Sequence, residues 1–444
     1  MLKKLSVFLF LILFVSQVSA QNKKIITLSW DKVVDYSLSD NLMLKSKMLE
    51  YDAQNLEVIR SYTNFLPTIT YTGAMTKNME LPVFVFMGQS VQIGSKYSFQ
   101  HSLDFSLPLF TGGSRLFNVL IQSNLKKSLS EELKGQESQT VLTALQSYYG
   151  IILSEELSKT AGEAVRVAKE NLDQVEKFYD NGSATELDLQ RAKAQYYSTL
   201  PQYEAASSNR MLAYQRLKTI LNISLEDSLE ISDTLYSKDF LNEYNVSSLQ
   251  EMKNLALERR NDIKSMRHRY DATETAEYVS LGKFAPMISL SGNIAHQAQM
   301  DDSKVMWDDY IRSKSLTLAV QWPLFEGGKR LIDYQLSKIQ TEQVEYALSQ
   351  TKDGALLEVE EKYSLYKQAV KSLNSLEQAM LLSKESMRIS SIMYNNGLST
   401  QIDVLNSQLL YTKSKADYLQ GIYNYNISQL ELLKAAGLMD KVWK

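Results

Sequence analysis

Side chains that could perform catalysis or bind a metal are scarce in this sequence. It contains no cysteine, which excludes a disulfide framework, a thiolate metal site and a cysteine nucleophile. Its three histidines, His101, His268 and His296, lack neighbours at the spacing of metal ligands, so we expect structural roles for them. We find no nucleophile elbow, zinc-binding helix motif, Walker loop or acid pair isolated in an apolar context. The sequence therefore predicts that the protein is not an enzyme and binds no cofactor or metal.

The first twenty residues are typical of a secretory signal peptide. Lys3 and Lys4 precede an apolar block from Val7 to Val15, and small residues lead up to Ala20. We expect cleavage after Ala20, which would take the formal net charge from −3 to −5 by removing the two lysines. No later segment approaches the ~20 apolar residues of a spanning helix, so membrane residence would require a β-barrel. Mild acidity without a basic stripe predicts no nucleic-acid partner.

Two stretches, 112–222 and 327–437, have the pattern of long paired helices. In the first stretch, apolar residues recur at steps of four and three, as in helices that supercoil around neighbours: Ala161, Val165, Ala168, Leu172, Val175 and Tyr179. No proline lies between Gly113 and Tyr179, so we expect a helix of about 67 residues and on the order of 100 Å. The turns that follow read Tyr179-Asp180-Asn181-Gly182 and Tyr394-Asn395-Asn396-Gly397. Pro201 should kink or restart the helix after the first turn.

The chain has the signs of an internal duplication. Tyr51 corresponds to Tyr270 at an offset of 219, and Tyr179 corresponds to Tyr394 at an offset of 215. We therefore predict a first repeat over 21–235 and a second over 236–444, each with a helix, two strands and a long helix pair. The opening helix of the first repeat should begin at Trp30 with Ser29 as its cap and run to about Asn64.

Each predicted repeat carries two short segments in which apolar and polar residues alternate. The segments centre on 69–75, 99–107, 288–294 and 316–322, and we expect loops at about 77–96 and 299–313. Proline and glycine residues lie at each predicted junction between strand and helix: Pro108, Gly112 and Gly113 at the first, and Pro323, Gly327 and Gly328 at the second. Such strands could form a half-buried soluble sheet. Their uncharged polar faces favour a membrane barrel instead, in which three copies would supply twelve strands.

These features together resemble the TolC family of outer-membrane efflux proteins. The resemblance rests on the two Pro-Leu-Phe-x-Gly-Gly junctions, the two Tyr-x-Asn-Gly turns, and the stretches Thr185–Leu189 and Thr400–Leu405 that follow them. It implies a mainly α protomer with a small β part: a duplicated long-helix α-barrel, plus four amphipathic strands that join a trimeric twelve-stranded β-barrel. It also implies a homotrimer in outer-membrane lipid that extends into the periplasm. There it would serve as the exit duct of an efflux or type I secretion system, with a periplasmic membrane-fusion adaptor and an inner-membrane transporter as partners.

The resemblance further implies roles for individual residues at the two turns. The adaptor-docking tip would comprise Tyr179, Asn181, Gly182, Tyr394, Asn396 and Gly397. Asp403 would line the periplasmic aperture, where close relatives carry a second acid one helical turn later and this chain has Asn406. Asp188 occupies the matching place in the first repeat. Three Asp403 carboxylates brought together would repel one another, which raises their pKa values and favours opening.

Alternatives remain open from the sequence. Gly and Asn at the two turns also suit the left-handed backbone of a tight connection between helices, and Asp403 could be an ordinary solvated acid. An exported coiled-coil scaffold or adhesin would share the long helices without transporting anything. The sequence does not identify the transported substrate, the pump or the resting state of the channel.

Overall fold

The computed structural model describes residues 25–243 and 248–443, so the predicted signal peptide (1–20) lies outside the described residues. The chain divides into two compact units. Unit 1 is built from the described residues up to Lys45, from Gln136 to Glu258, and from Leu357 onward. Unit 2 comprises Ser46–Gly135 and Arg259–Leu356. Each unit draws residues from both predicted repeats, and the repeat boundaries stay a prediction.

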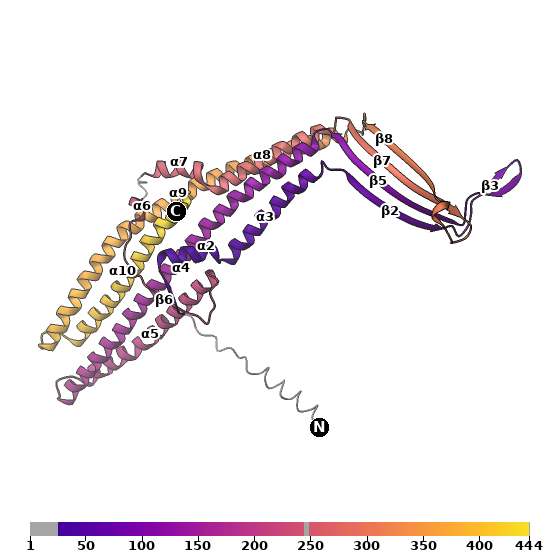
Figure 1. Ribbon diagram of the computed structural model, residues 1–444. Coiled ribbons are helices and arrows are strands. Elements are labelled where there is room, and N and C mark those ends of the chain that lie inside the picture. The colour runs from indigo at the N-terminus through magenta and orange to yellow at the C-terminus, as the bar shows by residue number, and fades with distance from the viewer. Residues whose placement is uncertain (1–24, 244–247, 444) are drawn as a thin grey trace, which may run out of the picture. The chain divides into compact units, whose positions relative to one another are not determined.

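Four long helices dominate the element order (Figure 1). Helices α4 (Ser114–Asp180) and α9 (Lys329–Asn395) each have 67 residues, the length predicted for the first of them. Each is followed, after a short turn, by a helix of 35 residues: α5 (Glu186–Ile220) or α10 (Gln401–Ala435). Helix α5 continues through Pro201, so the predicted restart is wrong. The proline ring is exposed to solvent, and the loss of one backbone donor does not end a helix of this length.

The core of unit 1 lies where the middle of α4 meets the end of α10. Tyr148 of α4 and Leu430 of α10 are among its largest fully buried side chains. Asn426 and Gln429 of α10 are also fully buried, and their amides hydrogen-bond backbone groups of residues 236–241. Because every one of these amide groups has a partner, their burial is compatible with a stable core.

Short elements complete unit 1. Strand β1 (Ile25–Leu28) pairs in parallel with β6 (Ser228–Ile231), a contact between distant segments that the sequence pattern did not predict. The remaining elements are the helices α6 (Phe240–Glu243) and α7 (Leu249–Arg259) and the 3-10 helix η2 (Met439–Val442).

The single opening helix predicted from Trp30 to Asn64 is wrong. The structure has α2 (Trp30–Ser39) and α3 (Leu42–Thr63) instead, and the side chain of Ser29 makes no capping hydrogen bond. Asn41 causes the break: its Oδ1 accepts from the backbone N–H of Leu44 at 3.0 Å, as in an N-cap, and its Nδ2 donates to the Ile220 carbonyl at 2.9 Å. In the second half of the chain, α7 and α8 (Asn261–Gly282) are also separate helices, but the Arg260 side chain before α8 makes no capping hydrogen bond.

Unit 2 contains a four-stranded antiparallel sheet in the order β2-β5-β7-β8 (Figure 1). The strands are β2 (Thr68–Lys77), β5 (Tyr97–Thr111), β7 (Met287–Met300) and β8 (Ile311–Gln321), which confirms the four predicted strands. Pro108 lies within β5 rather than at its end. A register shift between Pro108 and Phe110 accommodates its missing N–H.

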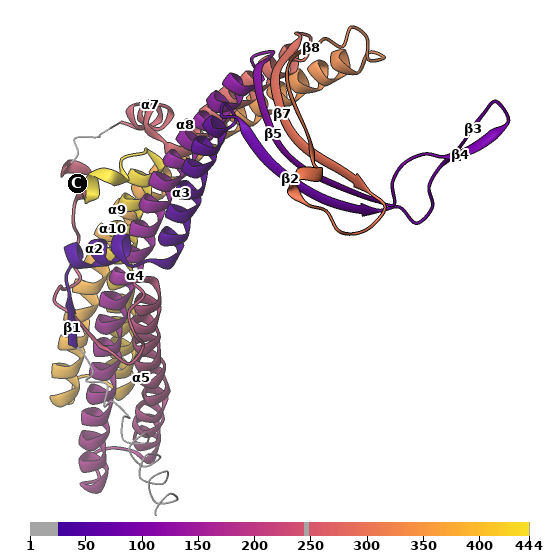
Figure 2. The ribbon, with the colours of Figure 1, turned by 45° about the vertical axis from the view of Figure 1, so that its right-hand side comes forward.

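The two connections between these strands differ from the predicted loops. The first contains a hairpin of β3 (Val83–Phe86) and β4 (Gln89–Gln92), which Figure 2 shows beyond the end of β2. The second contains the 3-10 helix η1 (Trp307–Asp309). The hairpin was missed because its two strands are only four residues long.

The sheet leaves its outer strands uncovered. Every residue of β2 and every residue of β8 is exposed, including Ile69, Tyr71, Leu316 and Leu318. Both strands are also edges of the sheet, so each presents unpaired backbone groups. Edge strands with apolar side chains and open hydrogen-bonding groups are able to pair with a further strand.

In the described part of the chain, we find no helix with the length and apolar character needed to cross a membrane.

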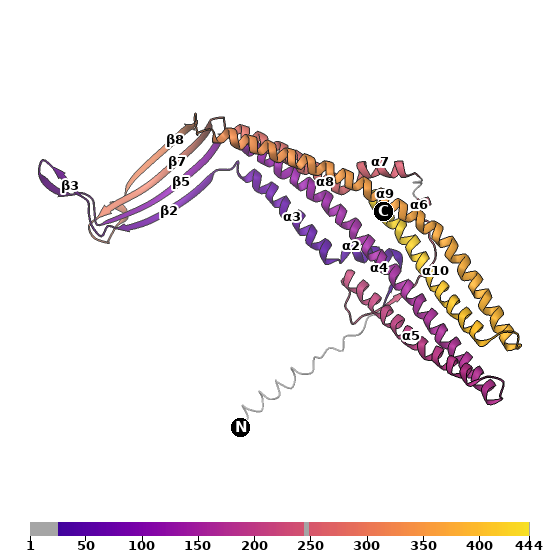
Figure 3. The same cartoon turned by 180° about the vertical axis from the view of Figure 1, so that it is seen from behind.

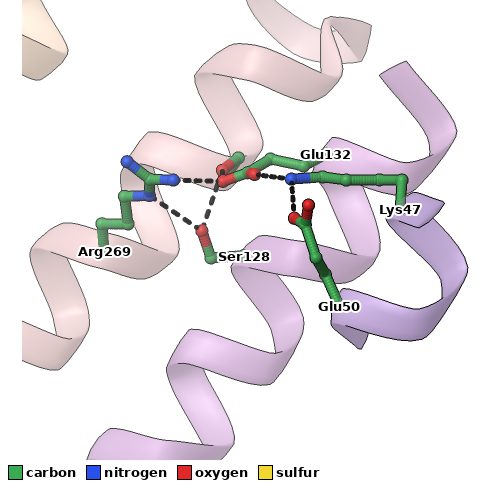
Figure 4. Close-up of polar contacts among 6 residues, drawn as sticks. Lys47, Glu50, Ser128, Glu132 and Arg269 are labelled. Carbon is green, nitrogen blue, oxygen red and sulfur yellow. Dashed lines mark hydrogen bonds and ion pairs between the residues drawn. The ribbon is translucent and has the colours of Figure 1, made fainter. Parts of the chain in front are cut away.

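The helices of unit 2 are joined by a polar cluster between α3, α4 and α8 (Figure 4). Glu132 of α4 binds Lys47 of α3 at 2.8 Å and also contacts Arg269 and Ser265 of α8. Burial opposes ionisation of Glu132, but the hydrogen bond from Lys47 and the charge of Arg269 outweigh it and lower the pKa of Glu132. The carboxylate therefore stays charged and holds three helices in register.

Candidate functional site

The two turns that end α4 and α9 have the same backbone structure. At the first, the Gly182 N–H donates to the Tyr179 carbonyl at 2.9 Å and the Ser183 N–H donates to the Phe178 carbonyl at 2.7 Å. At the second, Gly397 and Leu398 repeat these bonds to Tyr394 and Met393. This pair of bonds is the Schellman motif, which requires a left-handed residue, and both glycines have φ of 71°.

The asparagines before these glycines complete the same pattern. Asn181 Nδ2 donates to the Lys177 carbonyl and Asn396 Nδ2 donates to the Ile392 carbonyl, each at 2.8 Å. The Asn and Gly residues predicted for the docking tip thus serve the backbone of the turn. Among the six residues predicted for the docking tip, only Tyr179 and Tyr394 have side chains that are not needed to shape the turn.

Both predicted aperture acids cap the helix that follows the turn. Asp188 Oδ2 accepts from the backbone N–H of Thr185 at 3.1 Å, and Asp403 Oδ2 accepts from that of Thr400 at 3.0 Å. In each case the threonine hydroxyl also donates to the acid at 2.6 Å. Carboxylates near a helix N-terminus are stabilised in this way.

The surroundings of Asp403 keep it charged. Hydrogen bonds from Thr400, through side chain and backbone, and from Ser399 lower the pKa of Asp403. These hydrogen bonds lower the pKa of Asp403, whereas the predicted repulsion among three Asp403 carboxylates would raise it. Asp403 and Asn406 are both exposed, whereas Asp188 is partly buried.

Within unit 1, side-chain hydrogen bonds connect the two helix pairs near their turns, and Figure 3 shows these ends of the helix pairs next to each other. Gln401 Nε2 donates to the Asp188 carbonyl at 2.9 Å, and Gln174 Nε2 donates to Asn395 Oδ1 at 2.6 Å. The rings of Phe178 and Tyr394 lie 6.1 Å apart. Burial, followed by the charge of Asp188, raises the pKa of Tyr394.

Gln401 is a site residue that the sequence reasoning missed. Its side chain is 3% exposed, and its Oε1 has no hydrogen-bond partner in this structure. The sequence did contain a signal for Gln401. The offset of 215 aligns it with the exposed Glu186, and the change from an acid to an amide indicates that the two positions have different environments.

The predicted strand–helix junctions also repeat in the structure. Gly112, Gly113, Gly327 and Gly328 all have positive φ, as the prediction of a sharp change of direction requires. At Gly112 there is a second constraint, since an added Cβ would lie 2.0 Å from the carbonyl oxygen of Gly282. Gly112 and Gly282 therefore allow two backbones to touch.

An arginine supports each junction, and neither was predicted. Arg115 stacks over Phe65 at 4.8 Å and donates to the carbonyls of Pro108 and Asn64. Arg330 stacks over Phe284 at 5.2 Å and donates to the Lys283 carbonyl at 3.3 Å. The offsets that align the two halves of the chain also align these arginines and phenylalanines, and that regularity could have identified them.

The same fold occurs in solved outer-membrane channels. CusC superposes with a TM-score of 0.77 at 18% identity, over 95% of both chains. The Campylobacter jejuni CmeC outer membrane channel superposes with a TM-score of 0.76 at 17% identity, over 92% of this chain and 85% of that one. These likenesses define the fold class, one of long paired helices and a small sheet.

Sequence comparison then identifies the family. The family model for outer membrane efflux proteins matches residues 33–222 and 253–438, and the chain belongs to this family. The alkaline protease secretion protein AprF of Pseudomonas aeruginosa is 19% identical over 348 residues, which cover 78% of this chain and 70% of AprF. The outer membrane protein TolC of Escherichia coli is 22% identical over 317 residues, 68% of this chain but less than two thirds (62%) of TolC. The protein is thus an outer-membrane channel protein of the efflux and secretion class.

Proposed function

We propose that three copies of this chain form the exit duct of a tripartite export system, with a periplasmic adaptor and an inner-membrane pump as partners. The observation that carries this proposal is the four-stranded sheet whose two edge strands, β2 and β8, are exposed along their whole length. Four strands are too few for a closed barrel, which needs about eight or more. Pairing β2 of one copy with β8 of the next would close twelve strands around one axis and remove both edges.

The two turns serve as the periplasmic end in this proposal. Tyr179 and Tyr394, on backbones shaped by Asn181, Gly182, Asn396 and Gly397, form the surface that meets the adaptor. Asp403, together with Asn406 and Asp188, lines the aperture. A hydrogen bond from the Tyr179 hydroxyl to Glu186 raises the pKa of Tyr179, so the phenol stays neutral and its oxygen can accept a hydrogen bond from the adaptor.

The duct needs no chemistry of its own. Substrates follow a wetted path, and the pump supplies the energy. Opening separates the two helix pairs of each copy, which breaks the bond from Gln401 to Asp188 and the bond from Gln174 to Asn395. Both are neutral hydrogen bonds, and a net value of about 1 kcal/mol for each makes them weak enough for a docking adaptor to break.

Single-channel conductance in planar bilayers tests this function. We expect the purified protein to give small cation-selective currents that lose their selectivity in Asp403→Asn. The amide keeps an acceptor for the Thr400 N–H while it removes the charge, so the helix cap is retained. Asp188→Asn makes the same change in the other cap, and we expect it to reduce selectivity less, because Asp188 is partly buried.

The outcomes separate the parts of the proposal. A large conductance that Asp403→Asn leaves unchanged would retain the duct and reject Asp403 as an aperture residue. A correctly inserted trimer that passes no current, before and after mutation, would contradict the duct itself and favour a scaffold or adhesin.

A further inference from the structure

The β3–β4 hairpin exposes apolar side chains on the connection between β2 and β5 (Figure 2). Phe84 is 64% exposed, Phe86 is 68% exposed and Met87 at the tip is 91% exposed. No residue from Leu81 to Ser95 carries a charge. Exposed hydrophobic strands without protective charges mark surfaces that another chain covers.

The tip of the hairpin reinforces this point. Met87 and Gly88 form a two-residue turn with φ of 48° and 81°. Two consecutive positive φ values are typical of a type I′ turn, in which Asn or Asp commonly precedes Gly. Methionine at the first position accepts an unfavourable backbone and places an apolar side chain at the most exposed point. A binding partner for the Met87 side chain would offset the cost of this backbone conformation.

The chemistry of the hairpin restricts its partner. It is a two-stranded sheet, so both outer edges carry unpaired backbone N–H and C=O groups. Burial in lipid hydrocarbon would leave these groups without partners, which is expensive. A charged surface would lose hydration against the phenylalanines without gaining an opposite charge. The partner should therefore be neutral and apolar, with strand edges of its own.

A second copy of the hairpin meets these requirements, and the other strand connection does not. The connection between β7 and β8 carries four aspartates, Asp301, Asp302, Asp308 and Asp309, and no hairpin. The hairpin also follows β2, an edge strand of the four-stranded sheet. In the proposed trimer β2 meets the next copy, so each hairpin begins at the seam between two copies.

We propose that the hairpins of the three copies pack against one another through the face that carries Phe84 and Phe86, and so narrow the outer mouth of the channel. This inference rests on the proposed trimer. The register places Gln89 opposite Phe86 on this face, whereas Ser90, opposite Val85, points to the other face. The two positions therefore distinguish the predicted contact face from its reverse.

Cysteine cross-linking tests the contact, because the chain contains no cysteine of its own. We expect Gln89→Cys to give covalent dimers under mild oxidation of the intact trimer in outer membranes, and Ser90→Cys to give far fewer. Lys304→Cys, at an exposed position of the acidic connection, is the control for random encounters and should not cross-link. Adding Phe84→Ser and Phe86→Ser to Gln89→Cys should abolish the cross-link and increase the conductance.

The readouts separate this inference from the function on which it depends. Absence of a trimer on native gels would overturn the proposed assembly and, with it, the contact between hairpins. A trimer in which neither position cross-links, or in which both do so equally, would overturn the hairpin contact. A fluorophore at Ser90→Cys that shifts to the blue only in lipid vesicles, without any cross-link from Gln89→Cys, would assign the hairpin to the membrane and also overturn it.

Discussion

The two interhelical turns share one backbone but differ in electrostatics. At the first, Asp188 lies 3.9 Å from Arg191, and Ala184 precedes the capping threonine. At the second, the position equivalent to Arg191 is Asn406, and Ser399 adds a hydrogen bond to Asp403 at 3.0 Å. The first acid has a cation beside it, while the second has only neutral donors among the hydrogen bonds described.

The two turns therefore share their backbone bonds but differ in the charges beside their capping acids. The Schellman bonds and the capping acids recur because any long helix pair needs them to reverse direction. Arg191 and Asn406, one helical turn further on, do not take part in reversing the chain direction, so the two positions can differ in charge. We infer that Asp403 at the second turn binds cations at the aperture, because its charge has no cation beside it among the described residues. At the first turn, Arg191 offsets the charge of Asp188.

The largest effect should come from giving the second turn the arginine of the first. We expect multivalent cations to bind at Asp403 and block the current. Asn406→Arg should lower their affinity by at least about tenfold, because a positive charge one helical turn from Asp403 opposes their binding. Titration of the single-channel current with such a cation measures this. Asn406→Gln is the control for side-chain size, and an equal loss there would contradict a charge effect.

The reciprocal change should act in the opposite direction and more weakly. Arg191→Asn removes the cation beside Asp188, so we expect tighter block by the same cations, by about threefold. Asp188 is partly buried and offers less access than Asp403, which limits the gain. If block weakens instead, the first turn does not line the aperture.

Glycine substitutions test whether the shared backbone is required. Gly397→Ala places a side chain at φ of 71° and should destabilise the protein by about 1–2 kcal/mol, with the same expected for Gly182→Ala. Gly354 is the matched control: it lies within α9 with open space around it, and Gly354→Ala should stabilise the helix by up to about 1 kcal/mol. Thermal unfolding of the three variants measures the contrast. A destabilising Gly354→Ala would show that volume, not backbone conformation, decides the result.

The smallest effect concerns pH. Because hydrogen bonds lower the folded-state pKa of Asp403, its contribution to stability is complete above the unfolded pKa of about 3.9 and is lost as the pH falls through the lower folded value. Cation selectivity should therefore persist at pH 5. Thr400→Val removes one donor and should move the loss of selectivity to higher pH, by less than about one unit. A wild-type midpoint well above 3.9 would instead show that repulsion among three Asp403 residues dominates.

The sequence by itself determined the repeated, local features of this protein. Steps of three and four apolar residues predicted the first long helix, and alternation predicted all four strands of the main sheet, because both patterns follow from the geometry of a single element. The Gly and Asn residues marked both turns because few other residues accept a left-handed backbone. The resemblance in these motifs also led to the family that the comparisons show.

Tertiary structure decided the features that depend on a distant partner. The break at Asn41 requires the carbonyl of Ile220, and β1 requires β6, more than 200 residues away. Gln401 looked like an ordinary polar helix residue until its amide was found buried against the Asp188 carbonyl. Local patterns report what one segment prefers. Which segments meet depends on packing between elements, and a single sequence does not contain that information in any local window.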